Sequence, residues 1–456
     1  MNPHESAASD FNRRDFLKGT SLATLMAVMG GVPLRAEDAK PADAPKKATN
    51  PPVNCAVIGC GLRGRDILNT LALMPNAPVV AVCDHYAPFL NRAKSAAPKS
   101  EGYTDYNQLL ANKDVQAVLI ATPTHLHREI TLAALQAGKH VYLEAPLAHS
   151  LDDARAIARA AQSALKSNFQ SGLQMRSDPQ RHFLLQFIRS GAAGKPISAR
   201  AQWHKKESWR RTSPSPEREQ ELNWRLSNAT SNGLIAEVGL HQIDVLGWFL
   251  KELPVAVTGF GGVRHWTDGR DVPDSIQATF EFPSGTLLNY DATLANSFDA
   301  DYEMLYGTDS AVMIRANKAW MFKEVDSPLL GWEVYARKDE FYKETGIALV
   351  ANATKIVAQG DKPVEDAPYS NTSLSYALES FVSNTYVVAS GVEDFASTFD
   401  INNTAALKEY LASLAKSRLP AAGWQEGYEA TVIAIKANEA ILKRQRIAFE
   451  KEWFQV

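Results

Sequence analysis

A glycine-rich turn followed by an acidic residue carries the most specific chemistry in the sequence. Residues 59–64 read Gly-Cys-Gly-Leu-Arg-Gly directly after the apolar run 55–58, and Asp84 ends a second apolar run, 79–83. Between a strand and a helix, such glycines allow a tight turn, close approach of the backbone to a pyrophosphate, and packing of helix on strand. A carboxylate about 20 residues later would bind a ribose hydroxyl.

The pattern therefore predicts a dinucleotide site. It favours NAD, because a carboxylate at Asp84 would repel the 2′-phosphate of NADP. The residues assigned to this site are Gly59, Gly61, Leu62, Arg63, Gly64 and Asp84.

A second group of ionisable residues falls on a helix predicted at 234–250. Glu237, His241 and Asp244 stand at i, i+4 and i+7, hence on one face of an otherwise strongly apolar helix. A structural hydrogen-bond network is one explanation. In a chain that also binds a dinucleotide, the pattern favours a reaction site with His241 as acid/base and Glu237 orienting or tuning it. Asp244 would then bind a substrate hydroxyl. A metal triad is disfavoured, because no H-E-x-x-H occurs.

Alternating strands and helices in the first part of the chain provide the scaffold for these residues. Apolar runs at 115–121, 140–143 and 169–173 continue the two earlier ones, with helical patterns at 127–137 and 151–165 between them. This alternation predicts a doubly wound parallel sheet.

After a helix at 182–190 the pattern changes to strands separated by turns, typical of a mostly antiparallel sheet. The strands are predicted at 197–204, 256–260, 275–282, 286–295 and 301–307, with helical segments at 374–388 and 426–449. The predicted fold class is α/β: an N-terminal Rossmann domain, residues 53–173, and a C-terminal α/β domain with a large open sheet, residues 174–456.

The N-terminus resembles a twin-arginine export signal. Arg13 and Arg14 precede a moderately apolar stretch, 22–34, that is too short for a stable membrane anchor. The twin-arginine machinery exports folded proteins, which suits an enzyme that loads a dinucleotide before leaving the cytoplasm. A chance pair of arginines is the alternative. We expect a signal peptide at 1–36, a flexible linker at 37–52, and a periplasmic or otherwise extracytoplasmic location.

Composition excludes several classes of partner. The 456-residue chain has a net charge of −3, so nothing suggests nucleic acid or an anionic membrane surface. The three cysteines, Cys55, Cys60 and Cys83, all fall in the predicted nucleotide-binding unit. An odd count on core strands is not a disulfide framework, and we expect them to be buried and reduced.

Four segments together resemble the Gfo/Idh/MocA family of NAD(P)-dependent sugar and cyclitol oxidoreductases. They are the glycine turn and residues 121–127, 137–146 and 237–244, so the resemblance covers nearly all of the mature sequence. It implies a sugar site between the two domains and an open sheet that forms a dimer or tetramer. It adds Thr122, Pro123, His127 and Glu144 to the cofactor site, although His127 could merely cap or pack a helix start.

The chain departs from this family at two positions. The usual Glu-Lys-Pro is Glu144-Ala145-Pro146, so the lysine that hydrogen-bonds the substrate hydroxyl is absent, and an aspartate is replaced by Glu237. Lys205 or His204, at the end of a predicted strand, could replace the lysine; a solvated basic strand end is the alternative.

Further candidates are weaker. Gln174 and Arg176 could line the sugar site or form a surface salt bridge. Flat faces for sugar stacking are offered by Trp209, Trp224, Tyr302 and Trp320, although aromatic residues are usually core.

These observations lead to one functional hypothesis and two alternatives. The hypothesis is an exported carbohydrate-active enzyme, similar to exported sugar oxidoreductases and NAD-dependent glycosidases of the superfamily. It transfers a hydride transiently from a sugar ring carbon, C3 by resemblance, to tightly bound NAD, with glycoside cleavage by elimination as one outcome. The alternatives are a net sugar dehydrogenase or sugar–sugar oxidoreductase, and a non-catalytic NAD-bound module.

Overall fold

The structure is a computed structural model that describes residues 51–456, apart from 332, 334–335, 337, 342–343 and 350–370. The predicted signal peptide, 1–36, and all but the last two residues of the predicted linker, 37–52, lie outside these described residues.

The first part of the chain forms a six-stranded sheet in the order β3-β2-β1-β4-β5-β6, and every pairing is parallel. Its central strands are short apolar runs buried along their whole length, as expected where helices cover both faces. The strands are β1 Cys55–Ile58, β2 Val79–Cys83, β3 Glu101–Tyr103, β4 Ala117–Ile120, β5 His140–Leu143 and β6 Phe169–Ser171. The helices are α3 Leu62–Leu71, α4 Ala87–Ala96, α5 Tyr106–Ala111, α6 His127–Gln136 and α7 Leu151–Ser163.

The second part forms a ten-stranded sheet in the order β14-β15-β13-β12-β11-β7-β10-β9-β8-β16. Only the β7–β10 pairing is parallel, so the predicted α/β fold with a mostly antiparallel second sheet is confirmed. The strands are β7 Pro196–His204, β8 Ala256–Gly262, β9 Ser275–Glu281, β10 Leu287–Thr293, β11 Asp301–Gly307, β12 Ser310–Arg315, β13 Lys318–Lys323, β14 Lys338–Phe341, β15 Glu344–Ala348 and β16 Ile447–Ala448.

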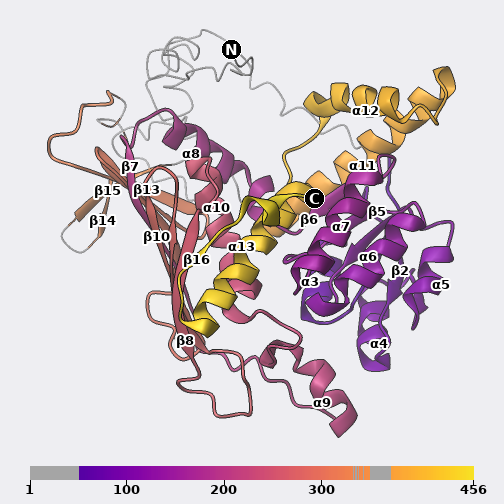
Figure 1. Cartoon of the computed structure of the whole chain (residues 1–456). Helices are drawn as coiled ribbons and strands as arrows, with labels where there is room; N and C mark the ends of the chain where they lie inside the picture. The colour runs from indigo at the N-terminus through magenta and orange to yellow at the C-terminus, as the bar shows by residue number, and fades with distance from the viewer. Residues whose placement is uncertain (1–50, 332, 334–335, 337, 342–343, 350–370) are drawn as a thin grey trace, which may run out of the picture.

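Three helices pack against the large sheet: α8 Pro179–Arg189, α10 Leu240–Leu250 and α13 Trp424–Lys443. By contrast, α11 Ser373–Thr398 packs on the Rossmann core, α12 Thr404–Ser413 packs on α11, and α9 Pro216–Leu222 lies apart from the strands of the large sheet (Figure 1). A π-helical turn, Ile235–Gly239, precedes α10, so the predicted helix 234–250 is not regular along its length.

The C-terminal helices join the two parts. Phe381 of α11 is fully buried and meets the ring of Tyr142 in β5 at 5.7 Å between centroids. Along α13, Tyr428 and Val432 belong to a Rossmann core cluster, whereas Ile441 belongs to the core cluster of the large sheet. One helix therefore packs on both cores and joins the two parts of the chain.

Several elements differ from the sequence-based expectation. The helix predicted at 374–388 runs to Thr398, and that predicted at 426–449 ends at Lys443, because Arg444 adopts φ 54 and the chain then forms β16. Several elements of the structure were not predicted from the sequence: β3, α4, α5, α9, α12 and strands β12 to β16. The three cysteines are buried and free. Among the described residues, the search for membrane spans finds no helix with the length and apolar character to cross a bilayer.

Candidate active site between the two sheets

A cleft of about 910 Å³ lies where the carboxyl ends of the Rossmann strands face the second part of the chain. Open α/β sheets bind ligands at this edge, where the strand order reverses. The Rossmann side supplies the glycine turn and the segments 121–127 and 144–145, and the other side supplies residues between Trp209 and His241. The sequence-predicted residues that line it are Gly59, Gly61, Leu62, Arg63, Asp84, Thr122, Pro123, His127, Glu144, Gln174, Glu237 and His241.

The three glycines of the turn have three different surroundings. A Cβ on Gly59, which adopts φ +89, would lie 2.7 Å from the backbone of Ala121, and one on Gly64 would lie 1.9 Å from the carbonyl oxygen of Gly59. Gly61 has no atom within 4 Å of its Cβ position. Gly59 and Gly64 therefore permit close backbone packing, while Gly61 leaves open space at the N-terminus of α3, where a pyrophosphate fits.

Asp84 is held at the end of β2 by backbone amides. Its Oδ2 accepts a hydrogen bond from the Cys60 N–H and its Oδ1 accepts one from the Tyr86 N–H, both at 2.8 Å. The first turn of α3 contains no acidic residue. A fixed carboxylate beside an unopposed helix N-terminus fits a ribose hydroxyl and the adjoining phosphates.

His127, the first residue of α6, is buried, and its ring contacts backbone carbonyl oxygens. Its Nδ1 lies 3.0 Å from the Pro146 carbonyl oxygen and its Nε2 lies 3.0 Å from that of Thr122. Burial lowers its pKa to about 4. Because both ring nitrogens face the backbone, His127 positions two segments of the cleft wall.

Arg63 supplies a positive charge beside Ala145, where the family lysine is missing. Its Nε donates to Glu144 Oε1 at 2.8 Å and its Nη2 donates to Gln174 Oε1 at 3.0 Å. These bonds join the N-terminus of α3 to the ends of β5 and β6. The cation at this part of the cleft therefore comes from the glycine turn.

His241 presents a neutral imidazole to the cleft. Burial, reinforced by the positive charge of Arg63, lowers its pKa to about 4. Its Nδ1 is buried and has no hydrogen-bond partner within the described structure. A neutral, unengaged imidazole in a cleft is equipped to accept a proton.

Glu237 is bound by residues other than His241. Oε1 accepts hydrogen bonds from Thr124 and Ser231 at 3.3 and 3.1 Å, and Oε2 accepts one from Arg225 Nε at 3.2 Å. Burial raises the pKa of Glu237, and the positive charge of Arg225 opposes this shift. The expectation that Glu237 tunes His241 is replaced by a different arrangement: Arg63 affects the pKa of His241, and Glu237 joins the two walls of the cleft.

Four of the predicted catalytic and substrate-binding residues lie outside this cleft. Lys205 binds Glu207 at 2.6 Å, and His204 Nε2 bonds Asp291 at 2.6 Å within the large sheet, so neither takes the place of the missing lysine. The end of β7 is held by its pairing with β10, where His204 lies opposite Thr293.

Arg176 and Asp244 bind one another instead of a cleft ligand. Two hydrogen bonds of 2.9 and 2.8 Å join them, and both border a separate cavity of about 280 Å³ with Trp248. Asp244 thus departs from the face shared by Glu237 and His241. The departure occurs within the regular helix α10, where Asp244 lies about one turn beyond His241 and meets Arg176 instead of the cleft.

Among the aromatic candidates, Trp209 and Trp224 line the cleft and are half-buried, whereas Tyr302 and Trp320 are buried in the second part. Sequence reasoning missed His125 and Arg225, which also line the cleft. The Trp224-Arg225 pair was visible as a sequence, but it lies in a segment without helical or strand periodicity. Within the described chain, no group of three or more His, Cys, Asp or Glu side chains is placed to hold a metal ion.

Comparison with known families agrees with both halves of this architecture. A model of the oxidoreductase family GFO_IDH_MocA, described as an NAD-binding Rossmann fold, matches residues 53–170. A model of the GFO/IDH/MocA C-terminal domain matches residues 183–312. The chain therefore belongs to the Gfo/Idh/MocA oxidoreductase family, and the prediction of NAD as cofactor is confirmed.

Individual relatives carry several activities. The chain is 26% identical over 264 residues to a 2,7-anhydro-N-acetylneuraminate hydratase of Escherichia coli K12, covering 58% of this chain and 67% of that protein. It is 32% identical over 205 residues to an inositol 2-dehydrogenase of Salmonella typhimurium LT2, covering 44% of this chain and 55% of that protein. The chain thus spans about two thirds of the first relative and just over half of the second.

A solved levoglucosan dehydrogenase, in complex with NADH, has a similar fold. The two chains superpose with a TM-score of 0.64 at 18% identity, over 87% of this chain and 99% of the other.

Proposed function

We propose that this protein is an exported enzyme that keeps NAD bound and oxidises a ring carbon of a sugar transiently, C3 by family resemblance, so that a glycosidic bond is cleaved by elimination. The observation that carries the proposal is the neutral imidazole of His241 beside the Arg63 cation, in a cleft whose glycine turn and Asp84 fit a dinucleotide.

Proton transfer in this scheme belongs to His241. NAD⁺, which the glycine turn and Asp84 would hold, would supply the hydride acceptor, and its reduced form would be the hydride donor. His241 accepts the hydroxyl proton of the substrate as the C–H hydride departs, and its weak basicity favours loss of proton and hydride together. Arg63 stabilises the developing negative charge on that oxygen, which is the role left open by Ala145.

The resulting ketone acidifies the adjacent C–H, so a base can remove that proton and the aglycone leaves. Addition of water and return of the hydride then restore the redox state of the sugar. His241 and Glu237 are the side chains of the second wall that could exchange these protons.

Two further observations support a redox-neutral cycle. The paired Arg13 and Arg14 suggest an enzyme working where no general NAD pool regenerates a dissociating cofactor. One relative is named as a hydratase, an activity without net oxidation. A net sugar dehydrogenase is the second candidate, favoured by the name of the inositol 2-dehydrogenase relative.

The test is turnover of glycosides deuterated at the oxidised carbon by the purified protein, without added NAD. We expect release of aglycone and retention of most of the deuterium in the product, detected by mass spectrometry. Accumulation of one NADH per sugar in excess NAD would instead establish a net dehydrogenase. Absence of any product from the whole glycoside panel would favour the non-catalytic alternative.

Export has a separate test. Replacing both arginines, Arg13→Lys with Arg14→Lys, should retain the protein in the cytoplasm, as measured by immunoblotting of periplasmic and cytoplasmic fractions. An unchanged periplasmic fraction would contradict the export proposal while leaving the chemistry untouched.

A further inference from the structure

A long segment between β7 and the π turn crosses from the large sheet to the cleft. We call residues 205–226 the strap. It contains α9, whose Arg218 lies 4.2 Å above the Tyr86 ring of the Rossmann part, and it carries Trp209 near its start and Trp224 near its end. Both indole rings line the cleft.

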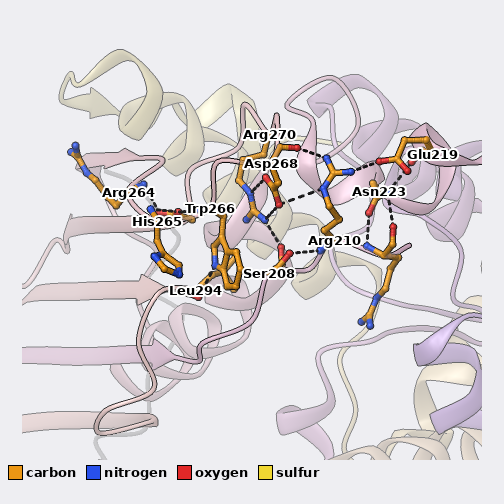
Figure 2. A network of polar contacts seen from close by, with 12 residues as sticks. Ser208, Arg210, Glu219, Asn223, Arg264, His265, Trp266, Asp268, Arg270 and Leu294 are labelled. Atoms are coloured by element: carbon orange, nitrogen blue, oxygen red, sulfur yellow. Dashed lines mark hydrogen bonds and ion pairs between the residues drawn. The ribbon is translucent and has the colours of Figure 1, made fainter. Parts of the chain in front are cut away.

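Trp209 is held in a conformation that bulky residues rarely adopt. Its φ is 61°, in the left-handed region, where a large side chain is an outlier that surrounding contacts must enforce. Figure 2 shows these contacts on both neighbouring residues. The Ser208 carbonyl accepts a hydrogen bond from Arg270, and the Ser208 hydroxyl accepts one from the Arg210 N–H at 3.1 Å.

The same network continues into the loop between β8 and β9. Arg210 binds Glu219 and Asp268, and the buried Arg270 binds Asp268 at 2.6 and 2.8 Å (Figure 2). Strain at one residue persists only when its surroundings over-determine it, and such sites cluster where ligands bind. By holding the backbone at Trp209, the network fixes the direction in which the Trp209 side chain lies at the cleft.

The last residues of the strap are hydrogen-bonded to its first residues. Asn223 accepts a hydrogen bond from the Arg211 N–H at 2.7 Å and donates one to the Arg211 carbonyl oxygen at 3.1 Å. This pair of hydrogen bonds joins the two ends of the strap. It brings Arg211, two residues after Trp209, beside Asn223, the residue before Trp224.

Arg225 lies against both indole rings. Its guanidinium carbon is 4.9 Å from the Trp224 ring centroid and 5.7 Å from that of Trp209, and its Nε binds Glu237. Its side chain is 41% exposed, so part of it is accessible to a ligand. The three side chains form one polar and aromatic surface, which we call the platform.

The platform has unused hydrogen-bond donors. Within the described structure, neither Trp209 nor Trp224 has a hydrogen-bond partner for its indole N–H. The structural tryptophan beside them differs, since the Trp266 N–H donates to the Leu294 carbonyl oxygen at 2.9 Å (Figure 2). Neither indole nitrogen is among the buried polar atoms that lack a partner, so both N–H groups are accessible and can donate to a ligand acceptor in the cleft.

We infer that Trp209, Trp224 and Arg225 form a second sugar subsite, for a hydroxylated ring beyond the one that reacts. The C–H face of a sugar ring is electropositive and packs on the negative face of an indole, while ring hydroxyls accept from N–H donors. Glu237 binds Arg225 and stands four residues before His241, which places the platform next to the reacting site. The inference rests on the proposed function and specifies its substrate class: glycosides with at least two rings.

Binding measurements test this without requiring turnover. The NAD-loaded protein is titrated with matched monosaccharide and disaccharide pairs, such as glucose with cellobiose and galactose with lactose, by calorimetry. In at least one pair we expect the disaccharide to bind about tenfold tighter, equivalent to about 1.4 kcal/mol. Trp209→Ala should abolish that advantage, and Trp209→Phe should keep most of it. Trp266→Phe is the matched control outside the cleft and should change neither affinity.

Three outcomes would overturn the inference. They are a panel in which no disaccharide exceeds its monosaccharide, an advantage that survives Trp209→Ala, and a Trp209→Ala protein that loses its NAD content while keeping its fold. The last would assign the platform to the cofactor. Failure of the proposed chemistry would appear instead as absent turnover with the disaccharide advantage intact, so the two ideas can fail separately.

Discussion

Replacing His241 with glutamine separates a proton-accepting role from a structural one. The wild-type imidazole has a pKa of about 4 in the folded protein, against an ordinary value of 6.5, because it is buried and lies near the Arg63 charge. Glutamine keeps a polar side chain of similar length but cannot accept a proton from a substrate. Loss of a general acid/base typically costs about 10²–10⁴-fold in rate. We expect a fall of that size in kcat, measured by product release from the best glycoside.

The same substitution should lower activity but raise the stability of the protein at acid pH, relative to wild type. The folded-state pKa is depressed, so the unfolded chain binds the proton more readily, and the wild type loses stability as the pH falls from 6.5 toward 4. Between pH 7.5 and 4.5 a group with these two pKa values loses about 2.5 kcal/mol. The free energy of unfolding of His241→Gln, relative to wild type, should therefore rise by about that amount over this range.

Urea unfolding at the two pH values, followed by tryptophan fluorescence at equal NAD saturation, gives the comparison. A constant difference between variant and wild type would refute the burial argument, because it would mean that His241 is protonated as easily folded as unfolded. Near-normal kcat per folded molecule would refute the assignment of His241 as proton acceptor.

Four further substitutions test the cofactor site and its surroundings. Gly61→Val should abolish NAD binding, measured by calorimetry, with little change in melting temperature, because no protein atom lies within 4 Å of the Cβ position. Gly64→Ala should instead lower the melting temperature, because its Cβ would lie 1.9 Å from a carbonyl oxygen. Asp84→Ser should reduce the preference for NAD over NADP, and an unchanged ratio of the two dissociation constants would remove Asp84 from the ribose site. Arg176→Ala should lower the free energy of unfolding in urea by roughly 3–5 kcal/mol, because it leaves the buried Asp244 carboxylate unpaired. NAD affinity should stay unchanged, and a marked loss of affinity would place Arg176 and Asp244 in the cofactor site.

Local patterns in the sequence predicted the Rossmann part well. Spacing alone identifies the turn glycines, and a carboxylate after a strand identifies Asp84, because each lies in or next to a regular element. The spacing on a predicted helix likewise pointed to His241, which lines the cleft. The position of Arg63 beside Ala145 was not predicted, because Arg63 meets Glu144 across 81 residues, a contact that depends on how α3 meets the end of β5. No periodicity in either segment carries that information.

The second part shows where such reasoning fails. The platform depends on a strained residue and on side-chain bonds from an irregular strap to a loop more than 40 residues later, and neither has a sequence pattern. Lys205 was placed at the cleft by assuming that β7 ends there, whereas the hydrogen bond of His204 to Asp291 holds that end within the sheet. Asp244 leaves the cleft because it lies about one turn beyond His241 in α10, within reach of Arg176, and helical spacing alone does not reveal that contact.

The packing of α11 on the Rossmann core sets an order of events during synthesis. Phe381 and its neighbours cover apolar side chains such as Tyr142, which are made more than two hundred residues earlier. At ribosomal speeds of about 5–20 residues per second, this apolar surface stays exposed for on the order of tens of seconds before α11 is synthesised. The dinucleotide-binding half is therefore finished only when the chain is nearly complete. We expect a nascent protein to acquire its cofactor after release, and chains terminated before α11 to become substrates for chaperones and proteases.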